Sequence, residues 1–72
     1  MRCLITLRSS TYAMRAQTVL RDHGMEARAL KLDGEYLGKG CTHGIRFDCK
    51  NRVFAERLLK ENGIPYSEIR IE

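Results

Sequence analysis

Three cysteines give this sequence most of its reactive chemistry, and Cys41 has the neighbours that best favour reaction. It lies in the segment Lys39–Gly40–Cys41–Thr42–His43–Gly44, among glycines and beside two basic side chains. Basic neighbours favour the thiolate, the nucleophilic form of cysteine, and small residues let a partner approach the sulfur. The spacing predicts an exposed, nucleophilic Cys41 supported by Lys39 and His43. An incidental loop cysteine among turn-forming glycines fits the same spacing equally well.

A metal site is another use of these residues, because thiolate and imidazole are both zinc ligands. It would join Cys41 and His43 to Cys49, which lies eight positions after Cys41. An intervening strand that rises about 3.3 Å per residue would hold the two cysteines more than about 10 Å apart. The chain also has no Cys-x-x-Cys pair. We therefore predict no metal site and no cofactor.

Cys3 and Cys49 each have a structural interpretation, as small apolar residues of the core. For Cys3 a second interpretation stays open, as a resolving thiol for Cys41 if the first strand starts beside the Cys41 loop. The opening residues lack the apolar stretch of about 7 to 15 residues of a secretory signal, so we expect a cytoplasmic protein. In that reducing compartment all three cysteines are expected to be free thiols.

The first half of the chain has the pattern of a strand, a helix and a second strand. Apolar residues alternate from Cys3 to Leu7, and residues 10–23 carry apolar side chains at helical spacing before Gly24. Residues 25–32 return to an extended pattern, in which alanines and leucines compete for the inward face. Residues 33–44 contain four glycines and no periodicity. They predict an irregular connection, and long connections are usually functional or mobile.

The second half repeats the first. Residues 45–49 alternate, an apolar stripe from Phe54 to Asn62 predicts a helix that ends at Gly63, and Ile69 and Ile71 predict a last strand. The segments 20–25 and 59–64 also align residue by residue, with leucine first and glycine fifth. The duplication therefore appears in the residues as well as in the pattern.

The order βαββαβ predicts one α+β domain over residues 1–72, with a ferredoxin-like sandwich fold. We expect a four-stranded antiparallel sheet in the order 4-1-3-2, with both helices on one face. Within it, we expect the first and third strands to lie at the centre and to run parallel to each other. That direction places Cys3 and the loop before Gly44 at one end of the sheet, and Cys49 at the other.

The composition limits the classes of function. Of the 72 residues, 43% are hydrophobic and 31% charged, and no apolar run approaches the roughly 20 residues of a membrane span. The net charge of +4 comes from basic residues scattered among acidic ones, which is typical of a mixed solvated surface. The outward positions expected on the two central strands, such as Leu4, Thr6 and Arg46, include no aromatic residue for stacking bases. Nucleic acid is therefore not an expected partner, although phosphate contacts from Arg8, Arg46 and Arg70 are conceivable.

Two functional classes fit a domain of this size. There is no paired-carboxylate cluster and no glycine-rich phosphate loop, so we do not expect a self-contained enzyme. One class is a small interaction module, which binds a protein partner or a second copy through its sheet face or an edge. The second strand, followed by the long connection, is expected to be an unprotected edge of this kind.

The second class follows from motifs that cover nearly the whole chain. A helix ends in Leu-x-x-x-Gly at residues 20–24, and a Gly-Cys loop leads into Gly-Ile-Arg-Phe-Asp at residues 44–48. Residues 58–66 read Leu-Leu-x-x-x-Gly-Ile-x-Tyr. With these motifs the chain resembles the small bacterial proteins described as selenium or sulfur carrier-like. The most specific element is the cysteine before the third strand, Cys41. Members of that family show Cys-Gly directly, whereas Thr42 and His43 here separate Cys41 from Gly44.

The resemblance implies a carrier without catalytic activity of its own. Cys41 would accept sulfur or selenium as a persulfide or perselenide from a cysteine desulfurase-type donor. It would then pass the atom to an acceptor protein or enzyme. The chemistry needs an exposed thiolate on a mobile loop.

Overall fold

Helix α1 spans Ser10–Asp22, close to the bounds that the sequence predicts. In this computed structural model, which describes residues 1–72, the Ser9 hydroxyl caps the helix by accepting a hydrogen bond from the Tyr12 amide at 3.1 Å. Gly24 follows with a φ of +81°, a left-handed conformation that glycine adopts without strain. Local caps therefore decide where α1 begins and ends.

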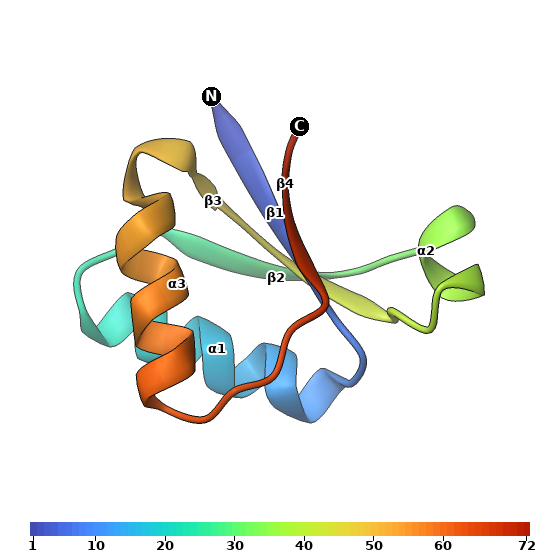
Figure 1. Ribbon diagram of the computed structural model, residues 1–72, viewed down its shortest axis with the longest axis horizontal. Coiled ribbons are helices and arrows are strands. Elements are labelled where there is room, and N and C mark those ends of the chain that lie inside the picture. Colours follow the sequence, from blue (N-terminus) through green and yellow to red (C-terminus); the bar gives the residue numbers. More distant parts are fainter.

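Four strands form one sheet in the order β2-β3-β1-β4. They span Arg2–Leu7 (β1), Ala27–Lys31 (β2), His43–Asp48 (β3) and Glu68–Ile71 (β4). Every neighbouring pair is antiparallel, with β1 and β3 at the centre (Figure 1). Read from the opposite edge, this is the predicted order 4-1-3-2. The α+β class and the antiparallel sheet are thereby confirmed.

The predicted direction of the two central strands is wrong. β1 and β3 run antiparallel, with Cys3 opposite Phe47 and Leu7 opposite His43. A helical crossover brings β2 back in the direction of β1, and the reversal between β2 and β3 then turns β3 against β1. The end of the sheet where β1 starts is therefore the end where β3 finishes. This places Cys3 beside Cys49 and away from Cys41.

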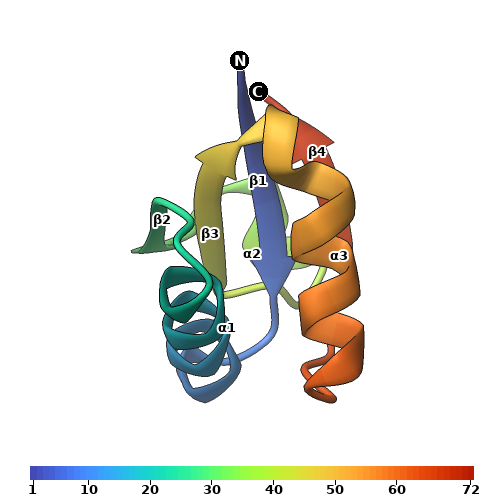
Figure 2. The same cartoon turned by 90° about the vertical axis from the view of Figure 1, so that its left-hand side faces the viewer.

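Two helices cover one face of the sheet. After β3, the short 3-10 helix η1 (Cys49–Asn51) leads into α3 (Arg52–Glu61). Figure 2 shows α1 and α3 on the same side of the sheet. Their inward residues meet the sheet in one buried cluster, which includes Ile5, Leu7, Leu20, Ile45 and Leu59. None of the helices has the length and apolar character needed to cross a membrane.

The opposite face is partly covered by the connection between β2 and β3. Within the segment expected to be irregular, Glu35–Gly38 forms the short helix α2, which lies on the far side of the sheet from α1 and α3 (Figure 2). Leu4 of β1 is buried there together with Leu32 and Cys41, and Thr6 is also fully buried. Leu4 and Thr6 therefore lie on the face away from α1 and α3, as expected, but this face is covered at both positions.

The edge of the sheet at β2 is not bare. Gln17 Oε1 of α1 accepts a hydrogen bond from the Ala29 amide at 2.7 Å, and Arg21 Nε donates to the Ala27 carbonyl at 2.8 Å. These are backbone groups that an added strand would need. The expectation of an unprotected edge is therefore corrected, because side chains from neighbouring turns of α1 occupy part of it.

Candidate functional site

Cys41 belongs to the connection between β2 and β3, and it is buried against the sheet. Only 2% of the residue is exposed. It is buried with Leu4 and Leu32, and Leu30 and Tyr36 pack against the same cluster. The prediction of an exposed thiol is therefore wrong for the folded structure. Neighbouring glycines do not determine where the backbone directs a side chain, and here it directs the cysteine onto an apolar patch.

Backbone hydrogen bonds hold this part of the chain in place. The Cys41 amide donates to the Tyr36 carbonyl at 3.0 Å, and the Thr42 amide donates to the Leu7 carbonyl at 3.0 Å. The Thr42 carbonyl accepts from the Leu32 amide at 2.9 Å. Thr42 is thus bound to the sheet, whereas the Cys41 amide is bound only to the α2 segment.

Lys39 and His43 flank Cys41 in the chain, but neither forms a hydrogen bond to its sulfur. Lys39 is the exposed residue that ends α2. His43 is half-buried, and its Nδ1 lies 2.9 Å from the Thr42 hydroxyl. That hydroxyl donates to the Arg8 carbonyl at 3.2 Å. The Thr42 hydroxyl therefore lies between the His43 ring and the Arg8 carbonyl.

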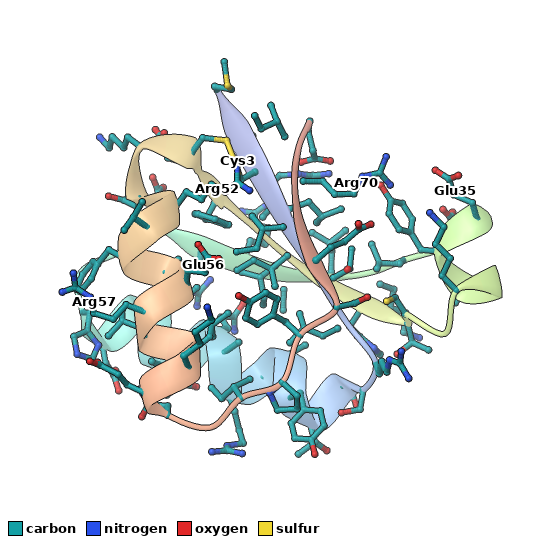
Figure 3. The ribbon with its side chains drawn as sticks, viewed as in Figure 1. Cys3, Glu35, Arg52, Glu56, Arg57 and Arg70 are labelled. Carbon is teal, nitrogen blue, oxygen red and sulfur yellow. A yellow bond between two sulfur atoms is a disulfide. The ribbon has the colours of Figure 1, made fainter.

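Arg70 of β4 connects the sheet to α2. Its guanidinium carbon lies 5.3 Å from the centre of the Tyr36 ring, and its Nη1 lies 3.7 Å from Glu35 Oε1, in the direction that Figure 3 shows. Nη1 is buried and has no hydrogen-bond partner. A cation–π contact contributes about 0.5–1 kcal/mol at exposed sites. We call this contact the Tyr36–Arg70 latch, because Tyr36 packs over the cluster that contains Cys41.

Cys3 and Cys49 form a disulfide, and their Cα atoms are 5.0 Å apart (Figure 3). The expectation of three free thiols is therefore wrong, because the antiparallel β3 delivers Cys49 to the start of β1. Cys3 is accordingly not placed to act as a resolving thiol for Cys41. Cys41 is the only free cysteine. A metal site made of Cys41, His43 and Cys49 would lack the Cys49 thiolate.

The ion pair with the shortest distance joins Arg46 and Glu72. It lies on the sheet face that carries Leu4, away from Cys41. Arg46 donates from Nε and Nη2 to the two carboxylate oxygens of Glu72, at 2.7 and 3.1 Å. This hydrogen bonding lowers the pKa of Glu72 and raises the pKa of Arg46. Two of the arginines considered for phosphate contacts are thus engaged, Arg46 with Glu72 and Arg70 with Tyr36.

Sequence reasoning missed Tyr36 and Arg70 as parts of the site. One signal for Tyr36 was present, because Tyr36 and Leu37 form an apolar pair in an otherwise polar, glycine-rich segment. Such side chains tend to find a surface to pack on. Arg70 gave no comparable signal. Its place beside the cluster follows from its pairing opposite Leu4, and that pairing depends on the strand order.

The comparisons with known proteins give one match. Residues 2–70 match the family described as "Putative Se/S carrier protein-like". No match was found among curated proteins, and none among solved structures. The matched range includes both halves of the chain, the free Cys41 and the disulfide. The chain therefore belongs to the "Putative Se/S carrier protein-like" family.

Proposed function

We propose that this protein carries sulfur or selenium as a persulfide or perselenide on Cys41. The family membership supports a carrier role. We choose Cys41 as the carrier residue because the disulfide leaves it as the only free thiol. A carrier needs one thiolate that accepts and releases the atom, because more demanding chemistry can reside in the donor and the acceptor.

The loading step is an exchange between sulfur atoms. The Cys41 thiolate attacks the terminal sulfur of a persulfide on a cysteine desulfurase-type donor. The S–S bond of the donor breaks, the donor cysteine leaves as a thiolate, and a new S–S bond joins the transferred sulfur to Cys41 Sγ. Attack by an acceptor thiolate on the same terminal sulfur unloads Cys41 by the equivalent exchange. A perselenide follows the same steps with selenium as the transferred atom.

Loading requires α2 to move away from Cys41, because a buried sulfur cannot reach a donor. None of the residues of α2 is fully buried, so the contacts that oppose this movement are chiefly those of Tyr36 with the cluster and with Arg70. Gly34 and Gly40, at the two ends of the segment, both have positive φ angles, of +61° and +85°. We infer that the donor displaces residues 34–40. Lys39 and His43 would then flank an open Cys41 and favour its thiolate.

We also propose a ferredoxin-like fold and a cytoplasmic location. The fold assignment is supported by the β-α-β order in each half of the chain and by the strand order β2-β3-β1-β4. A reducing compartment suits a carrier, because it keeps Cys41 from forming disulfides with other molecules. The desulfurase-type donor and the acceptor are then cytoplasmic proteins.

Intact mass spectrometry tests the proposal after incubation of the protein with a cysteine desulfurase and cysteine. Wild type should gain one sulfur atom, which a reductant removes, and Cys41→Ser should gain none. A Cys3→Ser/Cys49→Ser double variant is the matched control, and it should still load through Cys41. No added sulfur on wild type, or equal addition on Cys41→Ser, would refute the carrier role of Cys41.

A further inference from the structure

The Cys3–Cys49 disulfide joins two residues that differ in their access to solvent. Cys3 is fully buried in the core beneath α1 and α3, whereas Cys49 is only partly buried at the margin of that core. Cys49 also lies outside the sheet, as the first residue of η1, with Lys50 directly after it. An incoming thiolate therefore meets the sulfur of Cys49 before that of Cys3.

A hollow of about 690 Å³ lies at the same end of the sheet. Its charged lining residues are Arg2, Arg21, Glu26, Arg28, Arg46 and Asp48. Neither Cys3 nor Cys49 lines the hollow, but Arg2 and Asp48, which directly precede them in the chain, do. When the Arg46–Glu72 pair is set aside, three arginines face two carboxylates. A space of this size and charge suits a small molecule that carries carboxylates.

We propose that Cys3 and Cys49 form a second reactive site, a dithiol–disulfide couple that exchanges with small anionic thiols such as glutathione. Cys49 is the sulfur that exchanges, and Cys3 is the resolving sulfur. In a reducing compartment, the disulfides that do occur are usually catalytic or redox-sensing. The proposal rests on the proposed cytoplasmic location but not on the chemistry of Cys41, which lies at the other end of β3.

Reduction of the disulfide consumes two small-molecule thiols. A first thiolate attacks Cys49 Sγ, the bond to Cys3 breaks, and Cys3 leaves as a thiolate that takes up a proton. A second thiolate attacks the small-molecule sulfur of the mixed disulfide, which releases a small disulfide and the Cys49 thiolate. Two electrons thus pass from the thiols to the protein, and the reverse steps reduce a small disulfide. In the reverse direction Cys49 is the nucleophile, because it is the less buried of the two cysteines.

The first test uses Cys41→Ser, in which Cys3 and Cys49 are the only cysteines. The protein is incubated with glutathione at several concentrations, and free thiols are then alkylated with N-ethylmaleimide. Mass spectrometry measures the reduced fraction, and circular dichroism monitors the fold. The reduction rate should rise in proportion to glutathione while the fold stays intact. A rate that does not depend on glutathione concentration would overturn the proposal, because the bond would then open only on unfolding.

The second test identifies the exchanging sulfur. In the Cys41→Ser background, Cys3→Ser and Cys49→Ser variants are incubated with oxidised glutathione. The adduct should form on Cys49 at least about tenfold faster than on Cys3, because attack depends on access to the thiolate. Equal rates would overturn the assignment. If either variant does not fold, acid quenching of the Cys41→Ser reaction and peptide mapping of its mixed disulfide give the same answer.

The third test concerns the charge of the thiol. Glutathione, which carries carboxylates, should react faster per thiolate than the neutral 2-mercaptoethanol. This advantage should shrink at high salt and in Arg2→Gln, because the thiolate of 2-mercaptoethanol carries only one negative charge and its rate should change less. Equal rates for the two thiols in wild type at low salt would show that the hollow does not select an anionic substrate.

Discussion

Gly44 of β3 lies against Leu4 and Leu32, two members of the small cluster around Cys41. A Cβ atom at this position would lie 2.8 Å from Leu4 Cδ1, 3.1 Å from Leu32 Cδ2 and 3.2 Å from the Ile5 carbonyl oxygen. The ends of the leucine side chains can shift, but the Ile5 carbonyl belongs to the central strand. The small cluster around Cys41 therefore depends on the missing side chain of Gly44.

We expect Gly44→Ala to lower the free energy of unfolding by about 1–3 kcal/mol, because the added methyl group overpacks this cluster. Urea denaturation of both proteins gives the difference. Gly38→Ala is the control, because a Cβ there meets no atom within 4 Å, and it should leave the urea midpoint close to that of wild type. Equal losses in the two variants would contradict this account of Gly44.

The hydrogen bond from Arg46 to Glu72 makes the free energy of unfolding depend on pH, through protonation of the Glu72 carboxylate. The pKa of Glu72 is lower in the folded protein than its ordinary value of 4.5. Such a carboxylate stabilises the fold above its unfolded pKa, and the stabilisation is lost as the pH falls through the folded pKa. Wild type should thus exceed Glu72→Gln in stability by less than about 1 kcal/mol near neutral pH, because both side chains are partly exposed.

Urea titrations from about pH 2 to pH 7 at low salt measure this difference. It should level off about one pH unit above the ordinary pKa of 4.5 and shrink toward zero in acid. Added salt should reduce it further. A difference that is the same at every pH would assign the effect of Glu72→Gln to something other than its charge.

At the scale of elements, α2 is the segment that packs Tyr36 on the cluster containing Cys41. Arg70→Ala should increase the rate of Cys41 alkylation about two- to fivefold, because it removes a contact of about 0.5–1 kcal/mol from the closed state. Tyr36→Ala should increase the rate more, since Tyr36 also packs on the cluster. Timed iodoacetamide labelling with peptide mapping measures both rates.

Arg28→Ala is the matched control for the Tyr36–Arg70 latch. Arg28 is paired opposite Arg46, and so shares the sheet face of Arg70. The latch contacts do not include it. This variant should leave Cys41 labelling at the wild-type rate. An unchanged rate in Arg70→Ala, or an equal increase in Arg28→Ala, would argue against the latch.

The elements differ in how far the sequence could predict them. The bounds of α1 depend on Ser9 and Gly24, which are local signals, and the sequence places them correctly. The direction of β3 relative to β1 and the burial of Cys41 depend on contacts between distant segments. Alternation shows that a strand has two faces, but it does not show that α2 covers Leu4. For the same reason the sequence could identify Cys41 as a candidate but could not show that α2 packs over it.

At the scale of the whole molecule, the disulfide closes a loop across 46 positions of the chain. Loop-closure entropy predicts that such a bond stabilises the fold by about 4 kcal/mol. Urea unfolding of Cys41→Ser with and without a reductant should show a loss of this size. Cys49→Ser in the same background should unfold at a midpoint that the reductant does not change. Equal midpoints of Cys41→Ser in both conditions would show that the bond adds no stability.

The side chains that occupy the β2 edge also influence how concentrated solutions of the protein should behave. With Gln17 and Arg21 bound to β2, this edge offers fewer free backbone groups for joining the sheet to that of another molecule. Replacing both residues by alanine should free the edge and promote strand-to-strand assembly into larger particles, whereas Arg57→Ala on α3 should not. Light scattering over a concentration series distinguishes the two variants. Two side chains that look like ordinary surface residues of α1 would then set the solubility of the protein.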